Sequence, residues 1–214
     1  MDIDAFMECV RQGTIPPSSP DGLDEHGWAH PEWYYHGTEH LRDRNECNER
    51  GMWAIVSRDL ARAMAEYISG RQVLEIMAGA GWLARALADE GVSIIATDNG
   101  EWDSRHEKMR RLFPIEQLEA SGAVRQHPET ELLLVSWPPY AESAIVPACE
   151  SWGTERPIIY IGETAGGCNA PDEWWDHFWE DRETQIPLAS WPGLHDHVFV
   201  GHWSNGHNAH EHLP

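Results

Sequence analysis

Residues 73–98 read VLEIMAGAGWLARALADEGVSIIATD, and this stretch decides the fold of the 214-residue chain. The apolar run Val73–Ile76 leads into a glycine-containing turn, and apolar side chains then recur at helical spacing over residues 82–87. A second apolar run, residues 92–96, is followed by Asp98. The pattern predicts a strand, a tight turn, a helix and a second strand that ends in an acid, which is one βαβ unit.

The turn and the two acids near it indicate what this unit binds. Gly79 and Gly81 let the backbone approach a ligand, because neither carries a Cβ. Asp98 ends the second strand, where ribose hydroxyls donate to a carboxylate in nucleotide-binding folds. Glu75 lies inside the first strand and would repel a phosphate, and the third glycine of the dinucleotide pattern is missing. We therefore expect a nucleoside ligand with a cationic group.

An acid in the first strand followed by this turn resembles the first motif of the class I S-adenosylmethionine-dependent methyltransferases. In that motif the acid precedes G-x-G-x-G, and here Met77 stands in place of the first glycine. The resemblance implies S-adenosylmethionine as the cofactor. It assigns cofactor binding to Glu75, Ala78, Gly79, Gly81, Asp98, Asn99 and Glu119.

The resemblance also implies a role for most of these residues. Gly79 and Gly81 would lie against the methionine part of the cofactor, and Asp98 would bind the ribose. Glu75 would order the loop, or the amino group through water. Glu119 would meet the adenine amino group, the alternative being a solvated charge at the start of a helix. The alternative for the whole unit is an ordinary βα turn that binds no ligand.

A second motif, LLLVSWPPY, occupies residues 132–140. A ligand in an open α/β sheet binds beyond the carboxyl ends of the strands, so the turn after this apolar run is expected at the same rim as Gly79 and Asp98. Pro138 and Pro139 stiffen that turn, and Tyr140 offers a flat apolar face with a polar tip.

This turn resembles the [Asp/Asn/Ser]-Pro-Pro-[Tyr/Phe] motif of methyltransferases that act on amino groups of adenine, cytosine or glutamine. The resemblance implies a catalytic role for Pro138 and Tyr140, and substrate contacts for Trp137, Pro139 and Tyr140. Trp137 occupies the position of the hydrogen-bond acceptor but has none to offer. Ser136 comes one residue too early and by strand alternation should point the other way. The alternative for Trp137 is a core indole.

The remaining pattern predicts an α/β fold, a doubly wound and mostly parallel seven-stranded sheet with an antiparallel edge hairpin. The expected strands are Val73–Ile76, 92–98, 115–118, 131–137, Pro157–Gly162, 185–191 and His197–Trp203. The last two strands form the hairpin, an ending that also resembles the class I methyltransferases. Helices are expected at 4–12, 59–68 with Ser57 as N-cap, 102–113 and 174–179.

The expected organisation has three parts. Residues 1–56 form an irregular, aromatic-rich N-terminal cap that includes Trp28, Trp33, Tyr34 and Tyr35. Residues 57–204 form the S-adenosylmethionine-binding domain, and residues 205–214 a polar tail.

Charge and composition limit the partners. The chain has 36 acids against 15 lysines and arginines, a formal net charge of −21, so we expect no direct binding of nucleic acid. A saline environment or a need for solubility would give the same balance. No run of 18 apolar residues and no signal-peptide core occur, so we expect no membrane span and a cytoplasmic location.

The cysteines and histidines suggest neither a metal nor a disulfide. Cys9, Cys47, Cys149 and Cys168 form no C-x-x-C pair, which indicates free thiols. A nucleophilic role for Cys168 would need a nearby base that the sequence does not reveal. The late histidines have spacings that suit a metal, but three of them lie in the polar tail, and we expect no metal site.

The sequence therefore predicts methyl transfer from S-adenosylmethionine to a small molecule, a nucleotide or a peptide. Two alternatives stay open. One is a module that binds the cofactor without catalysis, which the departures at Met77 and Trp137 suggest. The other is a different enzyme on the same fold, one that degrades the cofactor or uses a dinucleotide. The oligomeric state is not determined by the sequence.

Overall fold

A seven-stranded sheet with the order β3-β2-β1-β4-β5-β7-β6 runs through the molecule. The computed structural model describes residues 1–23, 39–101, 109–140, 144–167 and 169–206. The strands are β1 Val73–Ile76, β2 Ile94–Asp98, β3 Ile115–Gln117, β4 Leu132–Ser136, β5 Pro157–Gly162, β6 Phe178–Glu180 and β7 His197–Trp203. β1 to β5 pair in parallel, whereas β7 is antiparallel to both β5 and β6. The predicted mostly parallel sheet with an antiparallel edge is confirmed.

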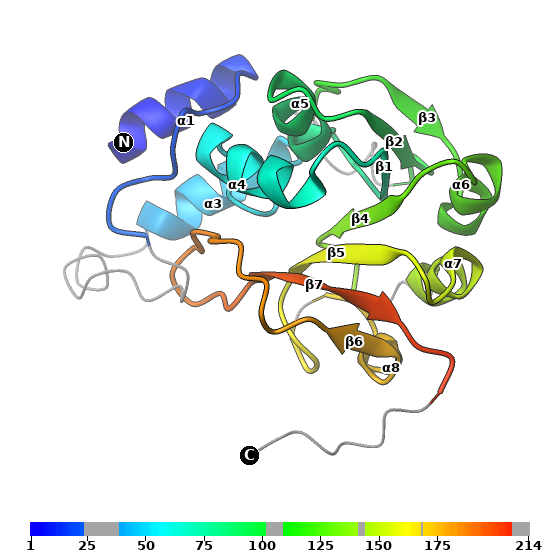
Figure 1. Ribbon diagram of the computed structural model, residues 1–214. Coiled ribbons are helices and arrows are strands. Elements are labelled where there is room, and N and C mark those ends of the chain that lie inside the picture. The colour runs from blue at the N-terminus through cyan, green and yellow to red at the C-terminus, as the bar shows by residue number, and fades with distance from the viewer. Residues whose placement is uncertain (24–38, 102–108, 141–143, 168, 207–214) are drawn as a thin grey trace.

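Helices cover both faces of the sheet (Figure 1). On one side lie α1 Ile3–Gln12, α3 Glu39–Glu49, α4 Arg58–Ile68 and α5 Trp82–Asp89; on the other lie α6 Ala120–Gln126, α7 Ile145–Trp152 and the short α8 Asp172–Trp175. Two apolar clusters follow this division, and neighbouring residues of one strand join opposite clusters. Leu132 and Leu134 face α4 and α5, whereas Leu133 and Val135 face α6 and α7. The sheet is doubly wound, as its sequence predicts.

Local capping explains where the first helices begin. The Ser57 hydroxyl oxygen accepts a hydrogen bond from the Leu60 N–H at 3.2 Å, which confirms Ser57 as the N-cap of α4. The Asp2 carboxylate does the same for α1 through the Ala5 N–H at 2.9 Å. α3 was not predicted; its sequence is almost wholly polar, and only Asp43 and Cys47 in it are buried.

The outer antiparallel strand differs from the prediction. Residues 185–191 form no strand, and only Ile186 makes a single bridge to β7. Pro187 in that stretch cannot donate to a strand ladder. β6 instead comes from the segment predicted as a helix over 174–179, because α8 already ends at Trp175. Gly201 of β7 admits this partner closely, since a Cβ there would lie 2.1 Å from the Trp179 carbonyl oxygen.

Other predictions fall partly outside the described residues. The helix expected at 102–113 lies mostly there, and residues 109–113 are not helical. The described residues also leave out the aromatic patch around Trp28 and Trp33, Cys168 and most of the tail. In the part of the chain that the structure covers, no helix is long and apolar enough to cross a membrane.

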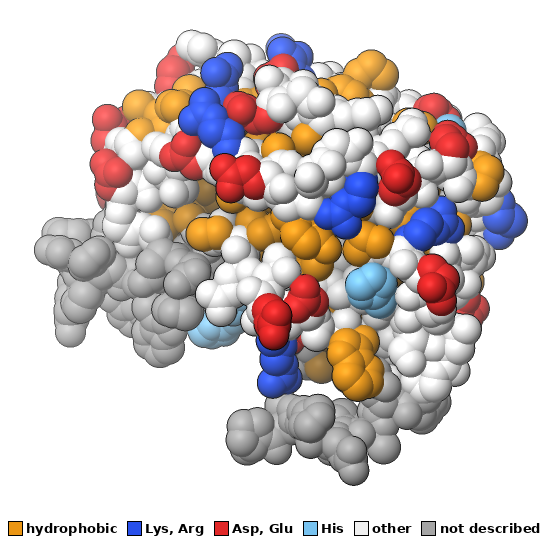
Figure 2. All heavy atoms as spheres, viewed as in Figure 1, with side chains coloured by type: hydrophobic (Ala, Val, Ile, Leu, Met, Phe, Trp, Pro, Cys, Tyr) orange, Lys and Arg blue, Asp and Glu red, His pale blue; other side chains and the backbone are white. Residues whose placement is uncertain are grey.

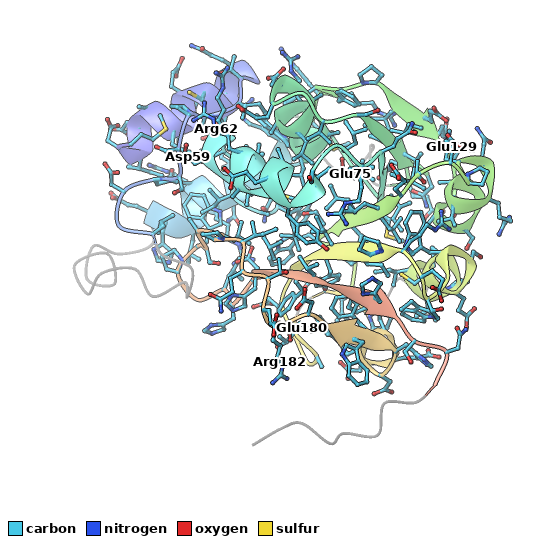
Figure 3. The ribbon with its side chains drawn as sticks, in the orientation of Figure 1. Asp59, Arg62, Glu75, Glu129, Glu180 and Arg182 are labelled. Carbon is cyan, nitrogen blue, oxygen red and sulfur yellow. The ribbon has the colours of Figure 1, made fainter. Side chains whose placement is uncertain are left out.

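Acidic and basic side chains are interspersed over the face seen in Figure 2. Many form short-range ion pairs, such as Arg62 with Asp59 at 3.4 Å and Arg182 with Glu180 at 3.5 Å. Figure 3 shows these pairs at the periphery, whereas Glu75 lies inside the molecule on β1. The position of Glu75 is unusual, because the charged form of an acid is costly to bury in a central strand.

Candidate functional site

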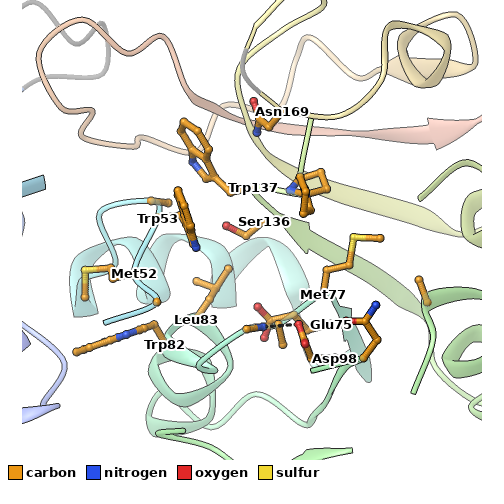
Figure 4. A pocket seen from close by; sticks show the side chains of 18 of the residues that line it. Met52, Trp53, Glu75, Met77, Trp82, Leu83, Asp98, Ser136, Trp137 and Asn169 are labelled. Atoms are coloured by element: carbon orange, nitrogen blue, oxygen red, sulfur yellow. Dashed lines mark hydrogen bonds between the residues drawn. The ribbon is translucent and has the colours of Figure 1, made fainter. Parts of the chain in front are cut away.

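A cavity of about 310 Å³ opens beyond the carboxyl ends of β1, β2 and β4 (Figure 4). This is where an open α/β sheet of this kind holds ligands. Among its walls are nearly all residues that the sequence singles out: Glu75, Ala78, Gly79, Asp98, Asn99, Glu119, Trp137, Pro138, Pro139 and Tyr140. Both predicted motifs therefore contribute to a single pocket.

The turn between β1 and α5 has the backbone that its glycine pattern suggests. Met77, Gly79 and Gly81 have φ angles of 56°, 54° and 77°. Met77 thus has a left-handed backbone conformation, which glycine adopts freely and a residue with a side chain adopts at some steric cost. A Cβ on Gly79 would meet nothing within 4 Å, which leaves its pocket side open to a ligand.

Gly81 has a different position from the one expected. It is the N-cap residue of α5 and is not among the residues that line the cavity. A Cβ on Gly81 would lie 2.9 Å from Phe113 Cβ and 3.0 Å from Ile115 Cδ1. Its glycine is explained by packing of the turn against the start of β3.

Asp98 holds two loops at the pocket rim. Its Oδ2 accepts a hydrogen bond from the Gly79 N–H at 2.9 Å, and its Oδ1 accepts one from the Gly100 N–H at 2.7 Å. The side chain is 8% exposed and lines the cavity. Because a carboxylate has about four acceptor positions, both oxygens keep capacity for ligand hydroxyls.

Glu75 is the electrostatic anomaly of the site. The residue is 2% exposed, and burial raises the pKa of its carboxyl to about 8, with a smaller contribution from the Asp98 charge; a backbone hydrogen bond from Ala84 opposes the shift. Its Oε2 atom is buried and has no hydrogen-bond partner among the described residues, and Glu75 is one of the residues that line the cavity. A buried acid in the pocket lining that has an unpartnered oxygen is suited to a cationic ligand group.

Asn99 and Glu119 lie on the β2–β3 side of the cavity. The Asn99 side-chain Oδ1 accepts a hydrogen bond from the Glu101 N–H at 3.0 Å, and the Asn99 backbone carbonyl accepts one from Gln117 Nε2 at 3.2 Å. Glu119 is the N-cap residue of α6 but makes no side-chain capping bond. Its carboxylate is therefore not committed to the helix end.

The turn after β4 departs from regular strand geometry. Trp137 has a φ of 50°, a left-handed conformation that breaks the alternation of the strand. Ser136 and Trp137 consequently both line the cavity, so the expectation that Ser136 points the other way is wrong. The Trp137 indole N–H donates to Asp196 Oδ2 at 3.1 Å, and burial raises the pKa of that carboxyl.

The two prolines are tied to the loop after β5. Pro139 forms an isolated antiparallel bridge with Asn169, and the Pro138 carbonyl accepts a hydrogen bond from the Ala170 N–H at 3.3 Å. Tyr140 follows at the pocket mouth and is 56% exposed. The turn is thus braced from behind, while its aromatic end stays accessible.

Several pocket residues are not found by sequence reasoning: Arg44, Met52, Trp53 and Asn169. The first three come from the segment before α4. Gly51 brings this segment against the turn, where a Cβ would lie 2.6 Å from Ala80 Cβ, and the Trp82 indole N–H donates to the Arg50 carbonyl at 2.9 Å. No local pattern reveals such a long-range approach.

Metal and thiol chemistry find no support in the described ranges. There, no three His, Cys, Asp or Glu side chains are grouped so that they could hold a metal ion. Cys9, Cys47 and Cys149 are free thiols, and burial raises the pKa of Cys47 and of Cys149 to about 12. Cys47 and Cys149 are therefore unreactive near neutral pH.

No protein-family profile and no curated protein match this chain. Solved structures resemble it at low identity. A human N-acetylserotonin methyltransferase in complex with S-adenosylmethionine aligns over 77% of this chain and about half, 54%, of its own, with 12% identity and a TM-score of 0.41. A magnesium protoporphyrin IX methyltransferase from Synechocystis PCC 6803 aligns over 87% of this chain and 100% of its own, with 11% identity and a TM-score of 0.46. An S-adenosylmethionine-dependent methyltransferase from Archaeoglobus fulgidus aligns over 69% and 95%, with 14% identity and a TM-score of 0.39. Similarity at these values does not extend to activity or substrate.

Proposed function

We propose that this chain binds S-adenosylmethionine and transfers its methyl group to a small molecule, nucleotide or peptide. The observation that carries the proposal is the unpartnered, buried Oε2 of Glu75 beside Asp98 and the open face of Gly79. The Glu75 oxygen matches an ammonium group, and the Asp98 carboxylate matches ribose hydroxyls. Gly79 matches a ligand that comes close to the backbone. A pyrophosphate would instead face two carboxylates, which argues against a dinucleotide.

The residues divide the cavity into two ends. Glu75, Gly79, Asp98, Asn99 and Glu119 would hold the cofactor on the β1–β3 side. When bound, the cofactor supplies a methyl group already activated by a sulfonium. The chain's own task is then to align an acceptor, which accounts for much of the catalysis in such a reaction.

The acceptor end is formed by Trp53, Trp137, Pro138, Pro139 and Tyr140. These residues would hold an acceptor with its lone pair directed at the methyl group that the cofactor would supply. A proton left on the acceptor would pass to water. Trp137 cannot accept that proton or a substrate hydrogen bond, since its indole is donor only and is bound to Asp196.

The first test is a comparison of three ligands by calorimetry: S-adenosylmethionine, S-adenosylhomocysteine and NAD. We expect both adenosyl compounds to bind and to raise the melting temperature, and NAD to do neither. Asp98→Asn should weaken binding, whereas Glu150→Gln, an exposed acid on α7, should leave it unchanged. Stabilisation by NAD alone would overturn the proposal, and cofactor binding without transfer to any acceptor offered would favour the non-catalytic alternative.

A further inference from the structure

The amide of Asn169 is a hydrogen-bond donor held at the acceptor end of the pocket. Asn169 is 2% exposed and lines the cavity. Its Oδ1 accepts a hydrogen bond from the Glu163 N–H at 3.0 Å, which fixes how the amide is turned. Its Nδ2 has no partner among the residues that the structure describes. In Figure 4 the nitrogen lies on the pocket side of the amide and the oxygen on the far side.

The surrounding backbone is built to hold this amide in place. Gly162 ends β5, and a Cβ there would lie 1.9 Å from Asn169 Nδ2, so only glycine leaves room for the amide. The bridge between Asn169 and Pro139 fixes the residue beside the Pro-Pro turn. Burying an amide N–H without a partner is unfavourable, so a native structure that holds one at a pocket wall suggests that a ligand completes it.

Flat aromatic walls stand beside this donor. The Trp53 and Trp137 rings lie at an interplanar angle of 24° with centroids 6.4 Å apart, and both line the cavity. The polar edge of Trp137 is bound to Asp196, which fixes the orientation of its ring. Tyr140 adds a half-exposed ring at the mouth. Such flat walls favour a planar ligand, because stacked rings gain most when they overlap face to face with an offset.

We propose that the methyl acceptor is a planar heteroaromatic ring with a carbonyl oxygen at its edge, and that Asn169 Nδ2 donates a hydrogen bond to that oxygen. Asn169 is in this view a specificity-determining residue. A ring that carries an amino group at the same edge would set two donors against each other and would be rejected. That the bound ring receives the methyl group rests on the proposed function, but the binding preference can be measured without methyl transfer.

The test compares 2-quinolone, which has a ring carbonyl, with 2-aminoquinoline, in which an amino group takes its place. Dissociation constants are measured by ligand-observed NMR at pH 8.5, with and without S-adenosylhomocysteine. We expect the wild-type chain to bind 2-quinolone at least tenfold more tightly. Asn169→Asp presents an acceptor instead of a donor and should reverse the preference. Asn205→Asp, an exposed position after β7, is the matched control and should keep it.

A second variant covers the case in which a buried aspartate prevents folding. Asn169→Ser has a shorter side chain whose hydroxyl does not reach the position of Nδ2, and it should bring the two constants within about twofold of each other. An unchanged preference in a folded Asn169→Ser, or equal binding of both probes by the wild type, would overturn the inference. Calorimetry with S-adenosylhomocysteine on the same samples separates the two proposals. If the wild-type chain does not bind S-adenosylhomocysteine, the proposed function is contradicted, whereas the preference between the two probes tests only the role of Asn169.

Discussion

The Asp98 carboxylate is bonded to the Gly79 backbone N–H at 2.9 Å across a separation of 19 residues. This contact joins the end of β2 to the turn after β1, the two places from which a nucleoside would be held. Asp98 therefore shapes the turn, and in the proposed function it would also offer acceptors to a ribose. Its removal should affect both the ligand and the loop.

Asp98→Ala should weaken S-adenosylmethionine binding by about 1–3 kcal/mol, the usual cost of losing charge-assisted hydrogen bonds. The Gly79 and Gly100 N–H groups, which both donate to this carboxylate, should also exchange with solvent faster. Calorimetry and amide hydrogen exchange measure the two effects. Full affinity in the variant would remove Asp98 from the cofactor site.

Glu75 should make stability depend on pH in the ligand-free chain. Burial raises the pKa of its carboxyl from an ordinary 4.5 to about 8, so the folded state favours the protonated form. The stability that this provides is complete below about pH 4.5 and is lost as the pH rises through 8. Glu75→Gln cannot titrate, so the difference in unfolding free energy between variant and wild type should grow from pH 5 to pH 9. Urea unfolding at several pH values checks this, and a constant difference would contradict it.

The Trp137–Asp196 pair should stabilise the acceptor end of the pocket. Asp196 is 1% exposed, and its Oδ1 has no partner among the described residues, so the indole is a substantial part of its hydrogen bonding. Trp137→Phe should lower the unfolding free energy by about 1–3 kcal/mol. Trp179→Phe, at a position that is 60% exposed, should change it by less than about 0.5 kcal/mol. Equal losses in the two variants would show that the hydrogen bond contributes nothing.

Tyr140→Ala should lower turnover far more than cofactor affinity, once an acceptor is in hand. The ring is half-exposed at the mouth and would orient the acceptor, which is the larger part of catalysis here. Stability should change little. The measurement is kcat beside the Kd for S-adenosylmethionine; equal losses in both would place Tyr140 in the cofactor site.

The isolated chain should not bind a generic DNA duplex near physiological salt. Its formal net charge of −21 repels the phosphate backbone, and the face in Figure 2 shows basic side chains interspersed with acids. Fluorescence anisotropy with a labelled duplex checks this. Tight binding that weakens steeply with salt would contradict the expectation.

The central part of the fold could be predicted because its signals are local. Two apolar runs and the helical apolar spacing between them, all within residues 73–98, predict β1, α5 and β2, and the buried strands Pro157–Gly162 and His197–Trp203 have the predicted bounds. The edge could not be predicted in this way. β6 is only three residues long, and it pairs through the backbone opposite Gly201, which leaves no periodic pattern to read.

The residues of the candidate site likewise differ in whether a local sequence pattern predicts them. Glu75, Gly79 and Asp98 follow directly from the strand ends, since parallel strands bring their carboxyl ends to one rim. Trp53 and Asn169 reach the pocket through long-range packing, and the left-handed φ of Trp137 turns its side chain against the alternation. Such positions depend on tertiary contacts that no local pattern encodes.

The most direct test of the cofactor site uses two ligands that differ in the amino-acid part. S-adenosylhomocysteine carries the ammonium that Glu75 would bind, and 5′-methylthioadenosine lacks it. In titration calorimetry, Glu75→Gln should weaken S-adenosylhomocysteine binding about tenfold or more and leave 5′-methylthioadenosine unchanged, because only the first ligand pairs with the buried carboxylate. Equal weakening of both ligands, or of neither, would contradict the claim that Glu75 receives the cationic end of the cofactor.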